Sequence, residues 1–197
     1  GMKIIGLTGS IASGKSTIAR MFRQYGMDVH DADKTVHQLL SPSGKATPVV
    51  ADYFGRDVLA ADGSVDRPAL GMKIFADPEA RNVLEGILHP LVYQSRQRFL
   101  ADIGRAGKSF AVLDVPLLFE TGGDAGCDYL VTVWAPMQTL RQRALRRPNM
   151  TKEKFAQIIK AQLPQSDKIR LSDLALPTSL GRAESRRRLK KWLARIR

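Results

Sequence analysis

The sequence has one cysteine, Cys127, and no hydrophobic run long enough to cross a membrane. A single cysteine cannot form a disulfide within the chain, which excludes a disulfide-stapled secreted domain and favours a reducing compartment. A membrane-spanning helix needs about 18 or more consecutive apolar residues. The apolar run at the start of the chain is also too short for a secretory signal. We therefore expect a cytoplasmic, soluble protein.

Acidic residues are scarce in the last third of the chain. The net charge is +12, and residues 137–197 contain 17 basic and 4 acidic residues, so this segment alone carries +13 and the remainder −1. Such a block could bind nucleic acid or hold a polyphosphate substrate. Aromatic residues for base stacking are scarce in the final run, 186–197, apart from Trp192. We interpret that run as a basic helix facing solvent.

The remaining composition is that of one globular domain with an insertion, because hydrophobic residues make up 44% and charged residues 25%. Short apolar runs alternate with helical periodicity, and this pattern predicts an α/β fold with a parallel sheet. Nearly eighty residues of mainly helical periodicity separate the second and third runs. That is more than a crossover requires, so we interpret them as a helical insertion. The predicted strands are 3–7, 27–30, 110–115, 129–134 and a weak 174–176, and the predicted helices include 15–24, 33–40, 47–54, 67–75 and 78–103.

A glycine-rich motif follows the first predicted strand and matches G-x-x-x-x-G-K-[ST] without departure. Backbone N–H groups of such a loop turn inward around phosphate oxygens, and the positive end of the following helix adds to that field. The lysine supplies a charge for the β- and γ-phosphates, and the hydroxyl can bind Mg²⁺. The motif therefore predicts a P-loop that binds a nucleoside triphosphate. Its residues are Gly9, Ser10, Ile11, Ala12, Ser13, Gly14, Lys15 and Ser16, and we add Thr17 to the predicted nucleotide-binding set.

Carboxylates follow two of the predicted strands. Asp31 and Asp33 come directly after the second strand, and in an extended segment they would point to opposite sides. Alone, such a pair is more often a helix cap or a turn, but beside a P-loop we predict that Asp33 is the base for an attacking hydroxyl. Asp114 ends the third strand before Pro116, and either holds Mg²⁺ or forms a turn.

An arginine-rich stretch, 141–147, follows the fourth predicted strand. Arginines on a mobile segment can close over phosphates and neutralise the charge that develops during transfer. Arg143 and Arg147 are four residues apart, so we expect them to share one helix face. His89 alone would more often be a packed imidazole, and one cysteine with three histidines makes no zinc pattern. Apolar side chains at helical spacing are predicted to be core: Phe75, Leu84, Leu88 and Leu91.

Together these residues resemble the dephospho-CoA kinase family, over about residues 3 to 182. The resemblance rests on Gly6-Leu7-Thr8-Gly9 before the P-loop, Asp31-Ala32-Asp33, Tyr53-Phe54-Gly55, 61–67, Leu84-Glu85, His89-Pro90-Leu91, 114–120, Met150-Thr151 and Ala161-Gln162.

The resemblance implies a P-loop NTPase fold of the α/β class, with a five-stranded parallel sheet flanked by helices, a helical substrate-binding insertion and a lid. It implies a nucleotide-binding core over 1–32 and 108–197, a lid at about 138–151 and an insertion over 33–107. It also implies a kinase that transfers the γ-phosphate of ATP to the 3′-hydroxyl of the ribose of dephospho-CoA, with Mg²⁺. By position the expected catalytic residues are Asp33, Lys15 and Arg143, with Ser16 on the metal and His89 in the substrate cleft. To these we add Arg147 for the nucleotide, Leu117 and Asp33 for the substrate, and Asp114 for the metal.

Two departures from the family pattern occur. Leu140 stands in place of a glutamine, and many members have an Ile-Asp-Asn-like strand end before a glycine where this chain reads Ala175-Leu176-Pro177-Thr178-Ser179-Leu180-Gly181. The second puts adenine-side contacts in doubt. Another P-loop kinase, of nucleotides or of the shikimate type, is the first alternative, and a nucleic-acid-stimulated ATPase is the second. Small molecules are the expected partners, without a membrane; we expect a monomer and leave an oligomer open.

Overall fold

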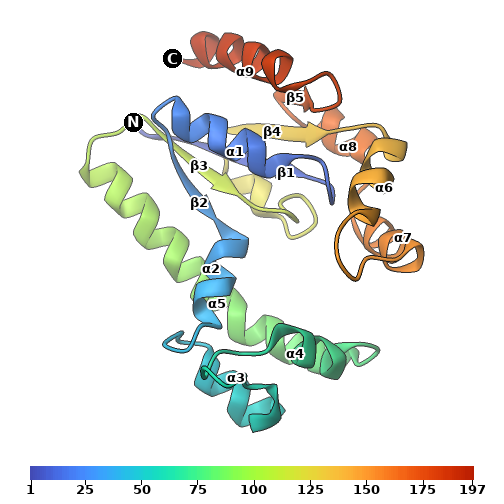
Figure 1. Ribbon diagram of the computed structural model, residues 1–197. Helices are drawn as coiled ribbons and strands as arrows, with labels where there is room; N and C mark the ends of the chain where they lie inside the picture. Colours follow the sequence, from blue (N-terminus) through green and yellow to red (C-terminus); the bar gives the residue numbers. More distant parts are fainter. The chain divides into compact units, whose positions relative to one another are not determined.

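The computed structural model describes residues 1–197, and the chain divides into two compact units (Figure 1). The first unit comprises Gly1–His30 and Ile103–Arg197, and the second comprises Asp31–Asp102. No helix combines the length and the apolar character that a membrane span requires.

A five-stranded parallel sheet lies at the centre of the first unit. Strand β1 pairs in parallel with β3 and with β4, and β4 pairs in parallel with β5. The order across the sheet is β2-β3-β1-β4-β5. Because β1 is covered on both faces, it is a nearly continuous apolar run in which Ile5 and Leu7 are fully buried. The five predicted strands are confirmed as β1 (Lys3–Gly9), β2 (Asp28–Asp31), β3 (Phe110–Asp114), β4 (Tyr129–Trp134) and β5 (Leu174–Pro177).

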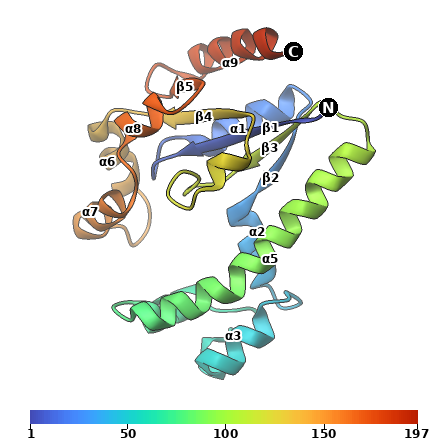
Figure 2. The same cartoon turned by 180° about the vertical axis from the view of Figure 1, so that it is seen from behind.

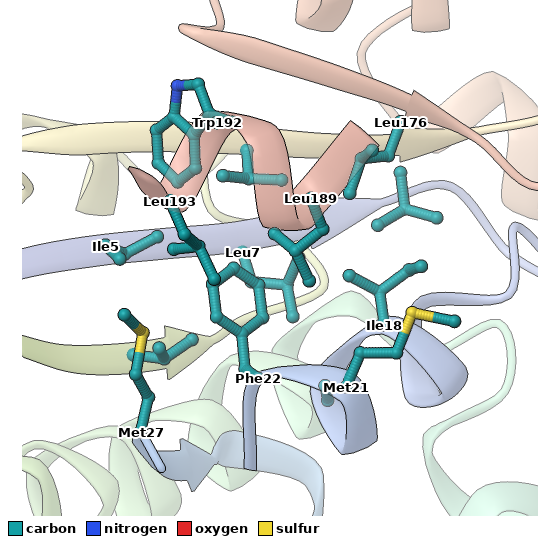
Figure 3. Close-up of a cluster of buried hydrophobic side chains, with 14 residues drawn as sticks. Ile5, Leu7, Ile18, Met21, Phe22, Met27, Leu176, Leu189, Trp192 and Leu193 are labelled. Carbon is teal, nitrogen blue, oxygen red and sulfur yellow. The ribbon is translucent and has the colours of Figure 1, made fainter. Parts of the chain in front are cut away.

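Two helices, α1 (Lys15–Gln24) and α9 (Arg182–Ile196), pack together over the sheet. Each helix contributes apolar side chains at i, i+3 and i+4, which share one helix face. Figure 3 shows Phe22 of α1 beside Leu193 of α9, close to Leu7 of β1. Burying a side chain such as Phe22 stabilises the fold by about 1.5–3 kcal/mol. The other elements of this unit are η2 (Gly123–Gly126), α6 (Met137–Leu145), α7 (Lys152–Ala161) and α8 (Gln165–Arg170).

The second unit is helical (Figure 2). It has a core of its own, which includes Val50, Val58 and Leu84. Leu88 and Leu91 pack against that core as predicted, but the prediction for Phe75 is wrong, since this side chain is 69% exposed. The helix ends at Ile74 and Phe75 is extended, so helical spacing no longer applies to it. Its elements are α2 (Ala32–Leu39), α3 (Thr47–Phe54), η1 (Arg56–Val58), α4 (Arg67–Ile74) and α5 (Pro78–Arg105), the last three residues of which belong to the first unit.

Candidate active site

The P-loop leaves β1 at Gly9 and enters α1 at Lys15 in a conformation that needs glycine at both conserved positions of the motif. A Cβ on Gly9 would lie 2.5 Å from Ser13 Oγ and 2.7 Å from the Val133 carbonyl oxygen. Gly14 has φ +90, and a Cβ there would meet Thr178 Cγ2 at 3.1 Å. A larger residue at either place would therefore displace the loop or strain its backbone.

The first turn of α1 presents backbone donors to an anion. No side chain caps this helix end, and the first N–H groups of any α-helix lack acceptors within the helix. Within the loop, the Ser13 N–H donates to the Ser10 carbonyl and the Thr17 N–H to the Gly14 carbonyl. No acidic residue occupies the first turn, so the positive end of the helix dipole is not neutralised locally. This arrangement suits phosphate oxygens.

Lys15 and Asp114 form an ion pair beside the loop. Lys15 Nζ donates to Asp114 Oδ1 at 2.5 Å, and the side chains are 15% and 5% exposed. Asp114 is the last residue of β3 and pairs in register with Leu7 of β1, two residues before the P-loop begins. The structure thus brings together the lysine and the strand-end carboxylate that the sequence predicted separately. The serine of the motif, Ser16, is exposed on the first turn of α1.

The Arg143 side chain, in α6, contacts backbone carbonyls of the P-loop. Its Nη1 donates to the carbonyls of Ala12 and Ser13, at 3.3 Å each, and to Thr178 Oγ1 at 2.9 Å. The Thr178 hydroxyl in turn donates to the Ser13 carbonyl at 2.6 Å. The threonine in the departure after β5 is therefore part of the hydrogen-bond network that holds the loop, a contact that the sequence did not predict.

Arg147 does not share a face with Arg143, and that expectation is wrong. The helix α6 ends at Leu145, so Arg147 lies beyond the helix and is exposed. The i, i+4 rule applies only inside a helix. Leu140, the departure three residues before Arg143, is fully buried in an apolar cluster with Phe155.

The predicted substrate residues and the base lie on surface positions. Asp31 ends β2 and caps α2, where its Oδ1 accepts the Lys34 N–H at 3.0 Å. Asp33 is therefore in the first helical turn, not in an extended segment as expected, and it is exposed. His89 is exposed on α5, and Leu117, after β3, is 39% exposed.

The sequence did not single out three side chains that the structure connects to the P-loop, one directly and two through the segment that follows α7. Gln162 Oε1 accepts the Ile11 N–H at 3.3 Å. Glu120 and the fully buried Lys168 form an ion pair of 3.0 Å. Gln162 and Glu120 stand in segments that carry the family resemblance, which was the available signal for them. Lys168 has no local signal, because its burial depends on β4 and on the segment after β3.

The family model and the curated relatives agree on one family. The family model described as dephospho-CoA kinase matches residues 3–183. A dephospho-CoA kinase of Mesorhizobium japonicum is 49% identical over 180 residues, which cover 91% of this chain and 89% of the relative. The crystal structure of TT1252 from Thermus thermophilus has a TM-score of 0.79 at 30% identity, covering 100% of this chain and 98% of that one. Dephospho-CoA kinase from Campylobacter jejuni has a TM-score of 0.67 at 21% identity, covering 99% and 97%, a likeness of fold.

Proposed function

The chain belongs to the dephospho-CoA kinase family, and on that premise we propose that it transfers the γ-phosphate of ATP to the 3′-hydroxyl of the ribose of dephospho-CoA. The products are coenzyme A and ADP. The observation that carries the proposal is the family match over residues 3–183, together with an intact P-loop whose Lys15 is paired with a strand-end carboxylate.

In the proposed reaction the hydroxyl oxygen attacks the γ-phosphorus, and the bond to the β,γ-bridging oxygen breaks as ADP leaves. Asp33 accepts the hydroxyl proton. Asp33 lies two residues beyond the end of β2, and in parallel sheets ligands bind at the carboxyl ends of the strands. Lys15 and the backbone N–H groups of the P-loop hold the phosphates and offset their charge.

Magnesium fits the donor set that the structure offers. The Ser16 hydroxyl and the Asp114 carboxylate are oxygen donors, which Mg²⁺ prefers, and this ion is commonly bound by one or two protein groups with phosphates and water. No cluster of three or more metal-ligating side chains occurs in the structure. When bound, Mg²⁺ would neutralise charge on the β- and γ-phosphates. We propose that Arg143 leaves its contacts with the P-loop carbonyls and Thr178 and then stabilises the transferred phosphoryl group. We propose that Arg147 binds the nucleotide.

His89 and Leu117 are proposed to contact dephospho-CoA, which is the acceptor. We also propose a cytoplasmic location, supported by the single cysteine, which fits a reducing compartment. Shikimate and nucleoside monophosphates remain the acceptors of the competing proposal, a P-loop kinase of another specificity.

The decisive experiment measures ADP release with Mg-ATP and a panel of acceptors, and identifies the product by mass. We expect release that depends on dephospho-CoA and yields one CoA per ADP. Coenzyme A is the sharpest control, because it is the same molecule with the 3′ position already phosphorylated, and it should support no release. Lys15→Met gives the background rate. Silence with dephospho-CoA and turnover with shikimate or a nucleoside monophosphate would overturn the proposed acceptor.

A further inference from the structure

Two apolar residues of the P-loop pack in a cluster with the helices α6 and α7, which form a helical hairpin. Ala12 is buried with Leu140 and Ala144 of α6 and Phe155 of α7. Ile11 packs against the same cluster. Ile11 and Ala12 thus pack against the hairpin, while the first turn of α1 supplies the anion-binding donors. A displacement of the hairpin would change the packing of the loop itself.

Two side chains, one near the end of α6 and one directly after α7, bind the backbone of the loop. Arg143, in α6, donates to the carbonyls of Ala12 and Ser13. Gln162, the extended residue directly after α7, accepts the N–H of Ile11 through Oε1. Arg143 therefore binds hydrogen-bond acceptors of the loop, and Gln162 binds a hydrogen-bond donor of the loop. Together they hold three peptide groups of the loop: Ser10–Ile11 through its N–H, and Ala12–Ser13 and Ser13–Gly14 through their carbonyls.

Gln162 is itself held by the segment that follows it. The N–H of Leu163 donates to Glu120 Oε2 at 2.9 Å, and Lys168 Nζ lies 3.0 Å from the same oxygen. The Gln165 amide bonds both the N–H and the carbonyl of Ala135, directly after β4. Residues 162–165 are therefore fastened to the segments that follow β3 and β4.

The ion pair between Lys168 and Glu120 is largely buried. Its side chain is 0% exposed, and that of Glu120 is 15% exposed. Removing one member of a buried ion pair leaves the other charge uncompensated and is strongly destabilising, whereas replacing both members can be neutral. The pair thus keeps an acceptor in place for the Leu163 N–H, next to the residue that contacts the P-loop.

We propose that Gln162 is a positioning residue for the nucleotide phosphates: it holds the Ile11 peptide group so that the P-loop keeps the shape that binds ATP. Glu120 and Lys168 position Gln162 through Leu163. The proposal rests on the proposed function only for its effect on turnover, because nucleotide affinity can be measured without any acceptor. It adds to the known roles of the P-loop residues a contact made from outside the motif.

The test compares Gln162→Met with Gln157→Met, in the full chain. Methionine keeps the length of the side chain and removes the acceptor; Gln157 is an exposed glutamine on α7 and serves as the matched control. For Gln162→Met we expect the Kd of ATP and of ADP, and the KM of ATP, to rise about 3- to 10-fold, the equivalent of one hydrogen bond. The KM of dephospho-CoA and the melting temperature should stay close to those of the control. ATP affinity equal to that of Gln157→Met would overturn the proposal.

A second pair of variants separates positioning from general stability. Glu120→Gln/Lys168→Met removes both charges and keeps an oxygen acceptor for Leu163, so its ATP affinity should match the wild type. Glu120→Leu/Lys168→Met removes the acceptor, and its Kd for ATP should rise about as much as that of Gln162→Met. Equal affinity in the two double variants would overturn the role of Glu120.

Two further outcomes separate this proposal from others. If Gln162→Met weakens the binding of both substrates and also lowers the melting temperature, Gln162 is only a structural residue. Normal ATP binding in a wild-type protein that does not turn over dephospho-CoA would contradict the proposed function alone.

Discussion

At the scale of single residues, two aspartates at the start of α2 do different things. Asp31 accepts the Lys34 N–H and caps the helix, so its carboxylate is engaged locally. Asp33 is in the first turn and exposed, so it is available to a hydroxyl group of a substrate. The helix cap that the sequence suggested as an alternative for the pair is thus observed at Asp31, and the catalytic role stays proposed for Asp33.

We predict that Asp33→Asn lowers kcat by about 100-fold or more, the usual contribution of a positioned base. Asparagine keeps the shape and removes the proton acceptor, so the Kd of ATP should not change. The matched control is Asp31→Asn, because asparagine also caps helices well and should preserve both the fold and kcat. Steady-state kinetics with ATP titrations check both variants. An unchanged kcat in Asp33→Asn would remove this residue from the role of base.

The sequence predicted local features of the site better than long-range ones. The P-loop conformation follows from eight consecutive residues, and both glycine positions prove sterically necessary. The contacts of Arg143 and Gln162 with the loop join residues 131 and 151 positions apart, and no local pattern specifies which backbone groups they reach. Buried Lys168 is harder still, because a lysine in a helix is normally predicted to face water.

At the scale of elements, the strands were predicted well because buried parallel strands are short apolar runs. Errors came from helix ends. Arg147 and Phe75 were assigned by helical spacing, yet each lies past the last residue of its helix. Helix ends depend on capping and on tertiary contacts, so they are the least predictable part of an element.

The first turn of α9 contains a charge cluster with a measurable pH dependence. Hydrogen bonds from Arg187, and then from Arg188, lower the pKa of Glu184 from 4.5 to about 2. Glu184 accepts from Arg187 Nε at 2.9 Å and Nη2 at 2.7 Å, and from Arg188 Nε at 2.8 Å. A carboxylate near the start of a helix is also favoured by the helix dipole. Because the pKa is lowered in the folded state, the contribution to stability is present above pH 4.5 and is lost as the pH falls toward 2.

We therefore predict that Glu184→Gln melts at a slightly lower temperature than the wild type at pH 5 to 7, and that the difference shrinks as the pH falls from 4.5 toward 2. The Glu184 side chain is 28% exposed and its arginine partners are more exposed, so the effect should be small and should weaken in high salt. Thermal unfolding of the two proteins across this pH range measures it. A difference that stays constant down to pH 3 would show that the ionised carboxylate is not its source.

At the scale of the whole molecule, the sequence shows where the positive charge is concentrated, in the last third of the chain. It does not show the order of the strands in the sheet. The predicted strands and their parallel pairing needed only local patterns, whereas the order β2-β3-β1-β4-β5 depends on how each crossover returns to the sheet. The positive charge of the last third reaches the surface on α9. Its exposed cationic side chains include Arg182, Arg186, Lys190, Lys191 and Arg195.

The same helix lacks what a nucleic-acid surface adds to positive charge. Trp192, the aromatic residue of the basic run, is 7% exposed and packs edge-on against Tyr129 with ring centroids 5.6 Å apart. It belongs to the core over the sheet, beside Leu189 and Leu193 (Figure 3). Its ring is therefore committed to packing and does not offer a base a stacking surface.

We predict that RNA and DNA bind this protein only through charge and do not stimulate ADP release. Filter binding with single-stranded RNA should give weak binding that falls steeply between 50 and 200 mM salt, since contacts between cations and phosphates release counterions. A variant with Lys190→Glu and Lys191→Glu should weaken that binding further and leave turnover of dephospho-CoA unchanged, because both side chains are exposed on α9. Faster ATP hydrolysis on addition of RNA, lost in this variant, would instead favour a nucleic-acid-stimulated ATPase and would give the basic helix a functional partner.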